Sequence, residues 1–310
     1  MQICPANIIY NFTLGNTRLT NWIIFLALSL VWGSSFILIK VALNGLSAVH
    51  VASLRVLSAG VVLLPVVLKN FTALPVKKLG LVFLSGILGS LLPAYLFCIA
   101  ETGLDSSTAG VLNALTPIFA VIIGAIFFKN VVPAIKIMGM LIAFGGSVLL
   151  YFSHSNILPG NNFFNVLLVV IATVCYGINV NLVRKSLKDV PSLIIAAFAL
   201  VSCAVIALLV LIFTGYFLLD FQNSELRWAT FYAGVLGVVG TAIASVFFYM
   251  LIKRAGVVFS SMVTYGIPVI ALGWGIYFGE KVGWIEAGCM LLILLGVYLA
   301  NSNKTVSDKM

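Results

Sequence analysis

The sequence predicts an all-α integral membrane protein with ten transmembrane helices, arranged as two inverted five-helix repeats with both termini on the cytoplasmic side. Three observations support this prediction. Of the 310 residues, 62% are hydrophobic and only 8% are charged, whereas about 25% of the residues of a soluble protein are charged. Long apolar runs follow one another with short connections, and the second half of the chain repeats the pattern of the first.

The membrane spans are predicted from the length of the apolar runs. A helix that crosses the bilayer needs about 20 mostly apolar residues. The boundary that is marked least clearly is the short connection "KNVVP" between the fourth run and the fifth. The ten predicted spans are 22–43, 49–68, 79–100, 106–128, 134–152, 163–184, 192–214, 229–252, 257–279 and 283–300.

No connection between the runs is long enough to form a soluble domain. The first 21 residues lack the basic start, apolar middle and cleavage site of a signal peptide, so we expect the first helix to remain in the mature protein. The expected organisation is a cytoplasmic N-terminal tail (1–21), a first repeat (22–152), a second repeat (163–300) and a cytoplasmic C-terminal tail (301–310).

The net charge of +9 is typical either of a nucleic-acid-binding surface or of the Lys and Arg excess in the cytoplasmic loops of membrane proteins. The distribution of the charges favours the second interpretation. With the N-terminus inside, 13 of the 17 basic residues lie in cytoplasmic segments, and the outer side holds only Lys40, Arg55, Arg227 and Lys281. We therefore expect no nucleic-acid partner.

Cysteine and histidine do not indicate a metal site. The five cysteines are odd in number and scattered, without a Cys-x-x-Cys pair, and the only histidines are His50 and His154. Neither a disulfide framework nor a zinc site follows from this pattern. We expect no metal and no cofactor.

The second half of the chain matches the first at constant offsets. "SGILGS" (85–90) aligns with "LGVVGT" (236–241) at an offset of 151 residues, and Pro117 then aligns with Pro268. "WGSSFILIKVAL" aligns with "YGINVNLVRKSL" at an offset of 144. Because each half has an odd number of spans, the second half enters the membrane from the opposite side. Inverted repeats of this kind are typical of secondary transporters, whose substrate site lies near the midplane of the membrane.

Several longer motifs carry a family resemblance: "VWGSSFILIK", "SLRVLSAG", "TAGVLNALTPIFAVIIGAIFF", "TYGIPVIALGWGIYFGE" and "GCMLLILLGVYLA". In their order and spacing, the chain resembles the ten-helix EamA-type family of the drug/metabolite transporter superfamily over residues 22–300. The resemblance implies a small-metabolite carrier of the inner membrane. Members usually have a glutamate after the proline-bearing helix of each repeat; Glu280 matches this pattern, but Lys129 stands at the equivalent position of the first repeat.

Aromatic and polar residues inside the spans are candidates for the lining of a central cavity. Trp32 and Ser35 share one face of the first helix, and Tyr176 and Asn179 repeat that arrangement in the second half. Such residues line a cavity or mediate tight helix packing, and the sequence leaves both open. The candidate cavity residues are Trp32, Ser35, Arg55, Tyr95, Asn113, Tyr176, Asn179, Tyr249, Thr264, Tyr265 and Trp274.

Pro117 and Pro268 lie in the middle of predicted spans. A proline there removes one helical hydrogen bond and frees the carbonyl four residues earlier, which belongs to Asn113 or Thr264. Unsatisfied backbone at membrane depth is tolerated where it lines a cavity or is buried in protein. We expect the prolines to act as hinges, with a static kink as the alternative.

Arg55 is expected inside the second span. Placing an arginine near the centre of a membrane helix costs about 2.5–3.5 kcal/mol, so it should face a partner. Together with Lys40 and Glu101 it forms either an outer gate or a structural ion pair, and it is also a candidate to bind a substrate carboxylate. No acidic residue lies near a helix centre, which favours facilitated diffusion or exchange and leaves proton antiport through Glu101 open.

The sequence therefore predicts a secondary transporter, not an enzyme, that works by alternating access and exports or equilibrates amino acids or related metabolites. Its partners would be a small-molecule substrate and membrane lipid; the oligomeric state is not predicted. The alternatives are a drug or nucleotide-sugar carrier of the same superfamily and, from another class, a membrane enzyme that acts on lipid-linked substrates. An enzyme would need an acid, base or metal cluster, which the predicted spans do not offer.

Overall fold

The computed structural model describes residues 17–104, 106–154, 163–270 and 283–300, and within these ranges the chain forms helices and no strand. The first half contains α1 (Thr17–Leu43), α2 (Ala48–Lys69), α3 (Val76–Gly86), the π-helix η2 (Ile87–Leu91), α4 (Leu92–Ala100), α5 (Ser106–Asn113), α6 (Thr116–Phe128) and α7 (Ala134–His154). The second half contains α8 (Phe163–Ser186), α9 (Ser192–Phe213), η3 (Tyr216–Leu218), α10 (Ser224–Gly237), the π-helix η4 (Val238–Ile243), α11 (Ala244–Ser261), the 3₁₀-helix η5 (Met262–Tyr265) and α13 (Trp284–Ala300).

Seven helical stretches in the described residues are long and apolar enough to cross a membrane: Arg18–Leu43, Ala48–Lys69, Val76–Ala100, Thr108–Phe128, Phe163–Ser186, Ser192–Phe213 and Ser224–Ile270. Two further apolar helices are shorter, Ala134–Leu150 and Ala287–Ala300. The predicted all-helical, multi-pass membrane architecture is confirmed. The number of ten spans and the side of the membrane on which the termini lie remain predictions.

The longest of these stretches, Ser224–Ile270, is divided at Gly256. This residue has φ 86° and ψ 175°, a left-handed backbone conformation that glycine adopts without steric cost. The break lies between the predicted spans 229–252 and 257–279, where the sequence predicts a connection. The stretch of 47 residues therefore contains a kink at a residue that permits it.

The two prolines do not lie inside continuous helices, and here the prediction is corrected. Pro117 occupies the first turn of α6, because α5 ends at Asn113 and α6 begins at Thr116. Pro268 follows the 3₁₀-helix η5 by three residues. A proline is tolerated in the first turn, where its missing N–H has no helical partner in any case. Both halves thus break the helix just before the proline; whether the breaks act as hinges remains a prediction.

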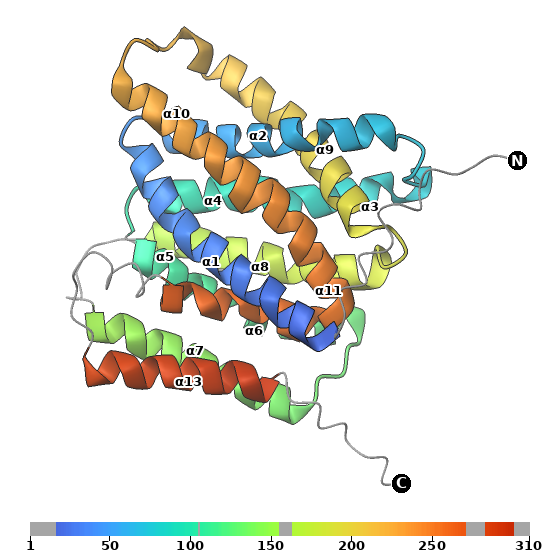
Figure 1. Cartoon of the computed structure of the whole chain (residues 1–310), viewed down its shortest axis with the longest axis vertical. Helices are drawn as coiled ribbons and strands as arrows, with labels where there is room; N and C mark the ends of the chain where they lie inside the picture. Colours follow the sequence, from blue (N-terminus) through green and yellow to red (C-terminus); the bar gives the residue numbers. More distant parts are fainter. Residues whose placement is uncertain (1–16, 105, 155–162, 271–282, 301–310) are drawn as a thin grey trace, which may run out of the picture.

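The helices of the two halves are interleaved. Figure 1 shows α7 and α13 side by side at one edge of the bundle, and α2 packs against α9 as a second pair of equivalent helices. In the middle, α8 contacts both α4 and α6, while α1 contacts both α10 and α11. Helices of each half therefore pack against the other half around a common centre.

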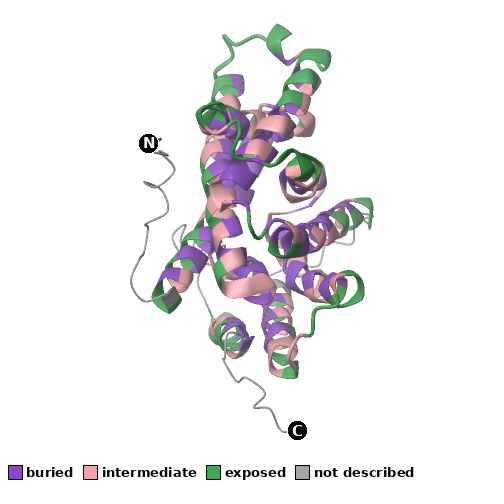
Figure 2. Ribbon diagram, turned by 90° about the vertical axis from the view of Figure 1, so that its right-hand side faces the viewer, coloured by how far each residue is buried: buried purple, intermediate pink, exposed green. Residues whose placement is uncertain are grey.

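The outer faces of the bundle are apolar. Figure 2 shows buried residues on the faces where helices meet and exposed residues on the faces that point away. Large apolar side chains are among the exposed ones, for example Phe127, which is 74% exposed, and Leu26 and Leu291. An apolar surface of this extent indicates contact with lipid.

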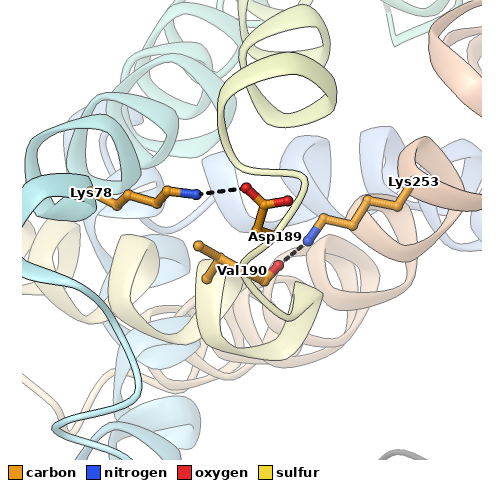
Figure 3. Close-up of polar contacts among 4 residues, drawn as sticks. All are labelled: Lys78, Asp189, Val190 and Lys253. Atoms are coloured by element: carbon orange, nitrogen blue, oxygen red, sulfur yellow. Dashed lines mark hydrogen bonds and ion pairs between the residues drawn. The ribbon is translucent and has the colours of Figure 1, made fainter.

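At one end of the bundle, polar contacts join α3, the connection between α8 and α9, and α11. Lys78 forms an ion pair with Asp189 at 3.3 Å, and the Lys253 ammonium donates to the carbonyl of Val190 (Figure 3). An ion pair this exposed contributes at most about 1 kcal/mol. The ion pair is informative for another reason: it lies at the end of the bundle that holds basic residues predicted to be cytoplasmic.

Candidate functional site

A cavity of about 70 Å³ lies at the centre of the bundle, between the two halves. Side chains and backbone from seven α-helices, the two π-helices, the 3₁₀-helix η5 and the residues after it form its wall, and most of that wall is apolar or aromatic. The lining residues are Trp32, Ser35, Phe36, Ile39, Arg55, Gly89, Ser90, Phe97, Asn113, Thr116, Tyr176, Asn179, Gly240, Thr241, Ser245, Phe248, Tyr249, Thr264 and Ile267.

The structure brings most of the candidate cavity residues together. Eight of the eleven line the central cavity: Trp32, Ser35, Arg55, Asn113, Tyr176, Asn179, Tyr249 and Thr264. They come from both halves of the chain. Their convergence around one space favours cavity lining over simple packing for this set, although their role in binding remains a proposal.

Two tyrosines lie outside the lining, which corrects the prediction. The hydroxyl of Tyr95 is hydrogen-bonded to Ser53 on α2 at 2.6 Å, and Tyr95 is not among the residues that line the cavity. Tyr265 is fully buried, and its hydroxyl donates to the carbonyl of Met140 on α7 at 3.0 Å. In both cases a buried hydroxyl is directed to the nearest acceptor on a neighbouring helix. Trp274 lies outside the described residues.

The two π-helices occupy equivalent positions in the two halves. Residues 87–91 of η2 and residues 238–242 of η4 are separated by the same offset of 151 residues. Short π-helical turns inside α-helices are rare and occur often at functional sites. Both contribute a glycine to the cavity wall, Gly89 and Gly240, and the indole Nε1 of Trp32 donates to the carbonyl of Gly240 at 3.0 Å. The wall of the cavity therefore includes backbone from both halves.

Aromatic pairs on two sides of the cavity are also related by the repeat. The rings of Trp32 and Phe248 meet edge to face with centroids 4.9 Å apart. The rings of Tyr176 and Phe97 are stacked with centroids 6.1 Å apart. Phe97 and Phe248 are 151 residues apart, so each half supplies one ring of each pair. Two flat aromatic faces thus border the same small space.

A polar network on the wall has no equivalent in the other half. Ser85 donates to the amide oxygen of Asn179 at 2.6 Å and lies 3.2 Å from the hydroxyl of Tyr249. The equivalent of Asn179, Ser35, instead donates to the carbonyl of Val31 in its own helix at 2.8 Å. The cavity is therefore asymmetric in its hydrogen-bonding groups, with an amide and a phenol held together on one side.

Arg55 joins the two halves at the cavity wall. Its Nε donates to the hydroxyl of Thr241 in η4 at 2.8 Å. The predicted ion pair with Glu101 is not formed; in the described part of the chain, the ion pair joins Lys78 and Asp189 instead. Lys40 is exposed. The expectation of an outer ion pair is therefore corrected. The guanidinium of Arg55 binds the hydroxyl of Thr241, and the carboxyl of Glu101 binds the hydroxyl of Ser106.

Glu101 lies behind the cavity wall, at the end of α4. It is fully buried; Oε2 accepts a hydrogen bond from Ser106 at 3.0 Å, and Oε1 has no hydrogen-bond partner in the described part of the chain. Burial raises the pKa of Glu101 to about 8, and the Ser106 hydrogen bond, Arg55 and Lys40 oppose this shift. A carboxyl in this setting holds its proton at neutral pH.

A second, larger cavity of about 250 Å³ lies further along α6. Ala120 of its lining is one helical turn from Thr116 of the central cavity, and Lys136, Arg184 and the kink residue Gly256 also line it. Arg184 donates to the carbonyls of Ile252 and Lys253, at the end of the helical segment before the kink. The sequence analysis did not anticipate this cavity, because it forms where a kink and a connection meet.

Several lining residues were also missed in the central cavity, namely Phe36, Ile39, Ser90, Phe97, Thr116, Thr241, Ser245, Phe248 and Ile267. The repeat contained a signal for some of them. Ser90 aligns with Thr241, and Phe97 with Phe248, at the offset of 151 residues. A search for polar or aromatic residues at equivalent positions of the two repeats would have identified both of these pairs.

Known proteins resemble the chain along nearly its whole length. The EamA-like transporter family matches residues 20–152 and 163–302. An uncharacterized transporter of Archaeoglobus fulgidus is 26% identical over 90% of this chain and 97% of its own length, and the uncharacterized inner membrane transporter YedA of Escherichia coli is 23% identical over 91% and 92%. A solved crystal structure shares the fold with a TM-score of 0.70 at 17% identity, covering 91% of this chain and 97% of that one.

Proposed function

Because the chain belongs to the EamA-like transporter family of the drug/metabolite transporter superfamily and is a multi-pass protein of the inner membrane, we propose that it is a secondary transporter of amino acids or related small metabolites. It works as an exporter or facilitator by alternating access. The ten spans form two inverted repeats with both termini in the cytoplasm, and the substrate binds in the central cavity between them.

The chemistry of the cavity supports a substrate with a carboxylate. Arg55 is the cation in the lining, and the other polar groups are amides and hydroxyls. In the same cavity wall, the hydroxyl of Ser90 is buried without a hydrogen-bond partner among the described residues. An unpaired buried hydroxyl costs about 1–3 kcal/mol, which a bound ligand would recover. The single observation that carries the proposal is that one mainly apolar and aromatic cavity contains both an arginine and an unsatisfied hydroxyl.

The size of the cavity supports alternating access. Its volume is about 70 Å³, whereas a protein cavity of about 150 Å³ is known to admit benzene. An amino acid with a side chain therefore needs the cavity to widen. The helix breaks before Pro117 and Pro268 and the kink at Gly256 provide places where helical segments can change direction without loss of internal hydrogen bonds.

The alternatives within the superfamily differ in the charges that they require. A nucleotide sugar carries two phosphates and would need several cations in the cavity, but Arg55 is the one that the described lining contains. A cationic drug would be disfavoured by the same arginine. A neutral or zwitterionic metabolite agrees best with one fixed positive charge and two aromatic faces.

Counterflow in proteoliposomes tests the proposal. Vesicles preloaded with pooled L-amino acids, nucleosides or nucleotide sugars are diluted into the labelled compound, and exchange is followed over time. We expect exchange of amino acids, which is lost or strongly weakened in Asn179→Ala. Two further variants each remove one tyrosine hydroxyl. Tyr249→Phe in the cavity should reduce exchange, whereas its control, Tyr95→Phe outside the cavity, should not. Exchange of nucleotide sugars but not amino acids would refute the substrate class.

A further inference from the structure

Glu101 is a buried carboxyl that the proposed transport site does not use directly. It has no exposed surface, and one of its two oxygens has no hydrogen-bond partner in the described part of the chain. An ionised carboxylate that is buried without a partner is among the most costly groups in a protein, so the neutral, protonated form is strongly favoured here. The surroundings of Glu101 in this structure therefore favour its proton-bound form.

The contacts of Glu101 connect it to the cavity wall. Ser106, at the start of α5, lies between Oε2 of Glu101 at 3.0 Å and the carbonyl of Phe36 at 3.3 Å. The backbone N–H of Glu101 donates to the carbonyl of Phe97. Phe36 and Phe97 both line the central cavity and meet edge to face with centroids 5.7 Å apart. Glu101 is therefore linked, through Ser106 and its own backbone, to two residues whose side chains line the cavity.

The charged and titratable groups near Glu101 are Arg55 from α2, Lys40 from α1 and Cys98 from its own helix. Both cations favour the ionised carboxylate. In the structure, however, the Nε of Arg55 is bound to Thr241, and the ion pair with Glu101 is not formed. Arg55 thus has two alternative partners: the second half of the chain, or Glu101 once its proton is lost.

We infer that Glu101 is the proton-binding group of this transporter, and that a proton moves together with each carboxylate-bearing substrate held by Arg55. The inference rests on the proposed function. When a substrate carboxylate pairs with Arg55, it neutralises the nearest cation that favours ionised Glu101, so substrate binding promotes proton binding. When the site empties and opens to water, Arg55 and Lys40 favour release of the proton. Substrate and proton therefore bind and leave as a pair and cross the membrane in the same direction. Of the exporter and the facilitator proposed above, this coupling agrees with the facilitator, whose net direction then follows the proton and substrate gradients.

The test uses proteoliposomes with the membrane potential clamped at zero by valinomycin and equal potassium concentrations. Net uptake of pooled labelled L-amino acids is measured with the outside one pH unit more acidic than the inside. Coupling of one proton per substrate allows an accumulation ratio of up to ten-fold, because one pH unit corresponds to a factor of ten in proton activity. Glu101→Gln, which mimics the protonated form, should retain counterflow but show no accumulation.

A second variant, Ser106→Ala, tests the inference independently in case Glu101→Gln does not fold. Ser106→Ala removes the hydrogen bond that stabilises the ionised carboxylate, so the pH at which uptake is half-maximal should rise while counterflow persists. Accumulation that persists in Glu101→Gln, or wild-type counterflow without any accumulation, would overturn the inference and leave the proposed function intact. Absence of amino-acid counterflow in the wild type would instead refute the proposed function. Accumulation driven by an acidic interior would reverse the sign of the coupling and also overturn the inference.

Discussion

Arg55 in α2 donates its Nε to the hydroxyl of Thr241 in η4 at 2.8 Å, so a cation of the first half is held by a π-helix of the second half, 186 residues away. Thr241 in turn lies 3.3 Å from the carbonyl of Leu236, to which its hydroxyl donates. The widened backbone of the π-helix brings this hydroxyl to the cavity wall. This contact is one of several direct hydrogen bonds between the two halves at the candidate site, beside those of Ser85 with Asn179 and of Trp32 with Gly240.

Thr241→Val should destabilise the protein by about 1.5–3 kcal/mol, because it removes a hydrogen-bond acceptor from a partly buried charged group while preserving the shape of the side chain. The measurement is the midpoint of thermal unfolding in detergent. Thr173→Val is the matched control, since that buried hydroxyl bonds only to the carbonyl of Val170 in its own helix. Equal effects of the two substitutions would contradict a special role for the Arg55–Thr241 contact.

Ser90→Ala should separate binding from stability. The buried hydroxyl of Ser90 has no partner in the described structure, so its removal should leave the unfolding midpoint unchanged or raise it. If the hydroxyl contacts the substrate, the concentration for half-maximal counterflow should rise by about ten-fold, equivalent to about 1.4 kcal/mol. Ser58→Ala, whose hydroxyl bonds to the carbonyl of Leu54 in its own helix, should leave that concentration unchanged. An unaltered value in Ser90→Ala would exclude this contact.

Gly89→Ala should abolish transport through a steric effect. A Cβ atom at this position would lie 2.2 Å from Nδ2 of Asn179, so the amide would have to move away from Ser85. We expect counterflow to fall at least ten-fold. Gly80→Ala is a suitable control because a Cβ atom there has no neighbour within 4 Å. Normal exchange by Gly89→Ala would show that the network around Asn179 is dispensable.

The raised pKa of Glu101 predicts the pH dependence of stability. Burial raises this pKa from 4.5 to about 8, so between these values the folded protein holds a proton that the unfolded chain has released. Stability therefore falls as the pH rises through this window, by at most about 1.4 kcal/mol per pH unit, and levels off above the folded-state pKa. Glu101→Gln should remove this slope, whereas Glu225→Gln at an exposed site should not. Parallel pH profiles for wild type and Glu101→Gln would contradict the assignment.

The amino-acid sequence alone was sufficient to predict several of the residues that line the cavity. The repeat offset and helical spacing selected Trp32 and Ser35 together with Tyr176 and Asn179, and all four line the cavity. Helical periodicity relates residues within one helix, and the repeat relates equivalent helices, so both signals survive without coordinates. The same offset pairs Ser90 with Thr241, a pair that the prediction overlooked.

Other features depend on how the helices are rotated against one another. Tyr95 and Tyr249 are both aromatic residues of membrane helices, yet one bonds to Ser53 away from the cavity and the other lines it. The sequence placed Arg55 and Glu101 in reach of each other, but it could not show that Thr241 is the partner that Arg55 takes. Which of several possible partners a side chain binds depends on distances that only the packed structure fixes.

Membrane insertion, helical character and the internal repeat follow from the sequence, because hydrophobicity and length are summed over about 20 residues and need no knowledge of neighbours. The cavity, the π-helices and the unpaired oxygen of Glu101 required the packed structure. Each of them depends on how segments pack against one another or on a local change in helical winding. A difference of one residue in helix register or a small rotation about a helix axis would change them without altering a single span.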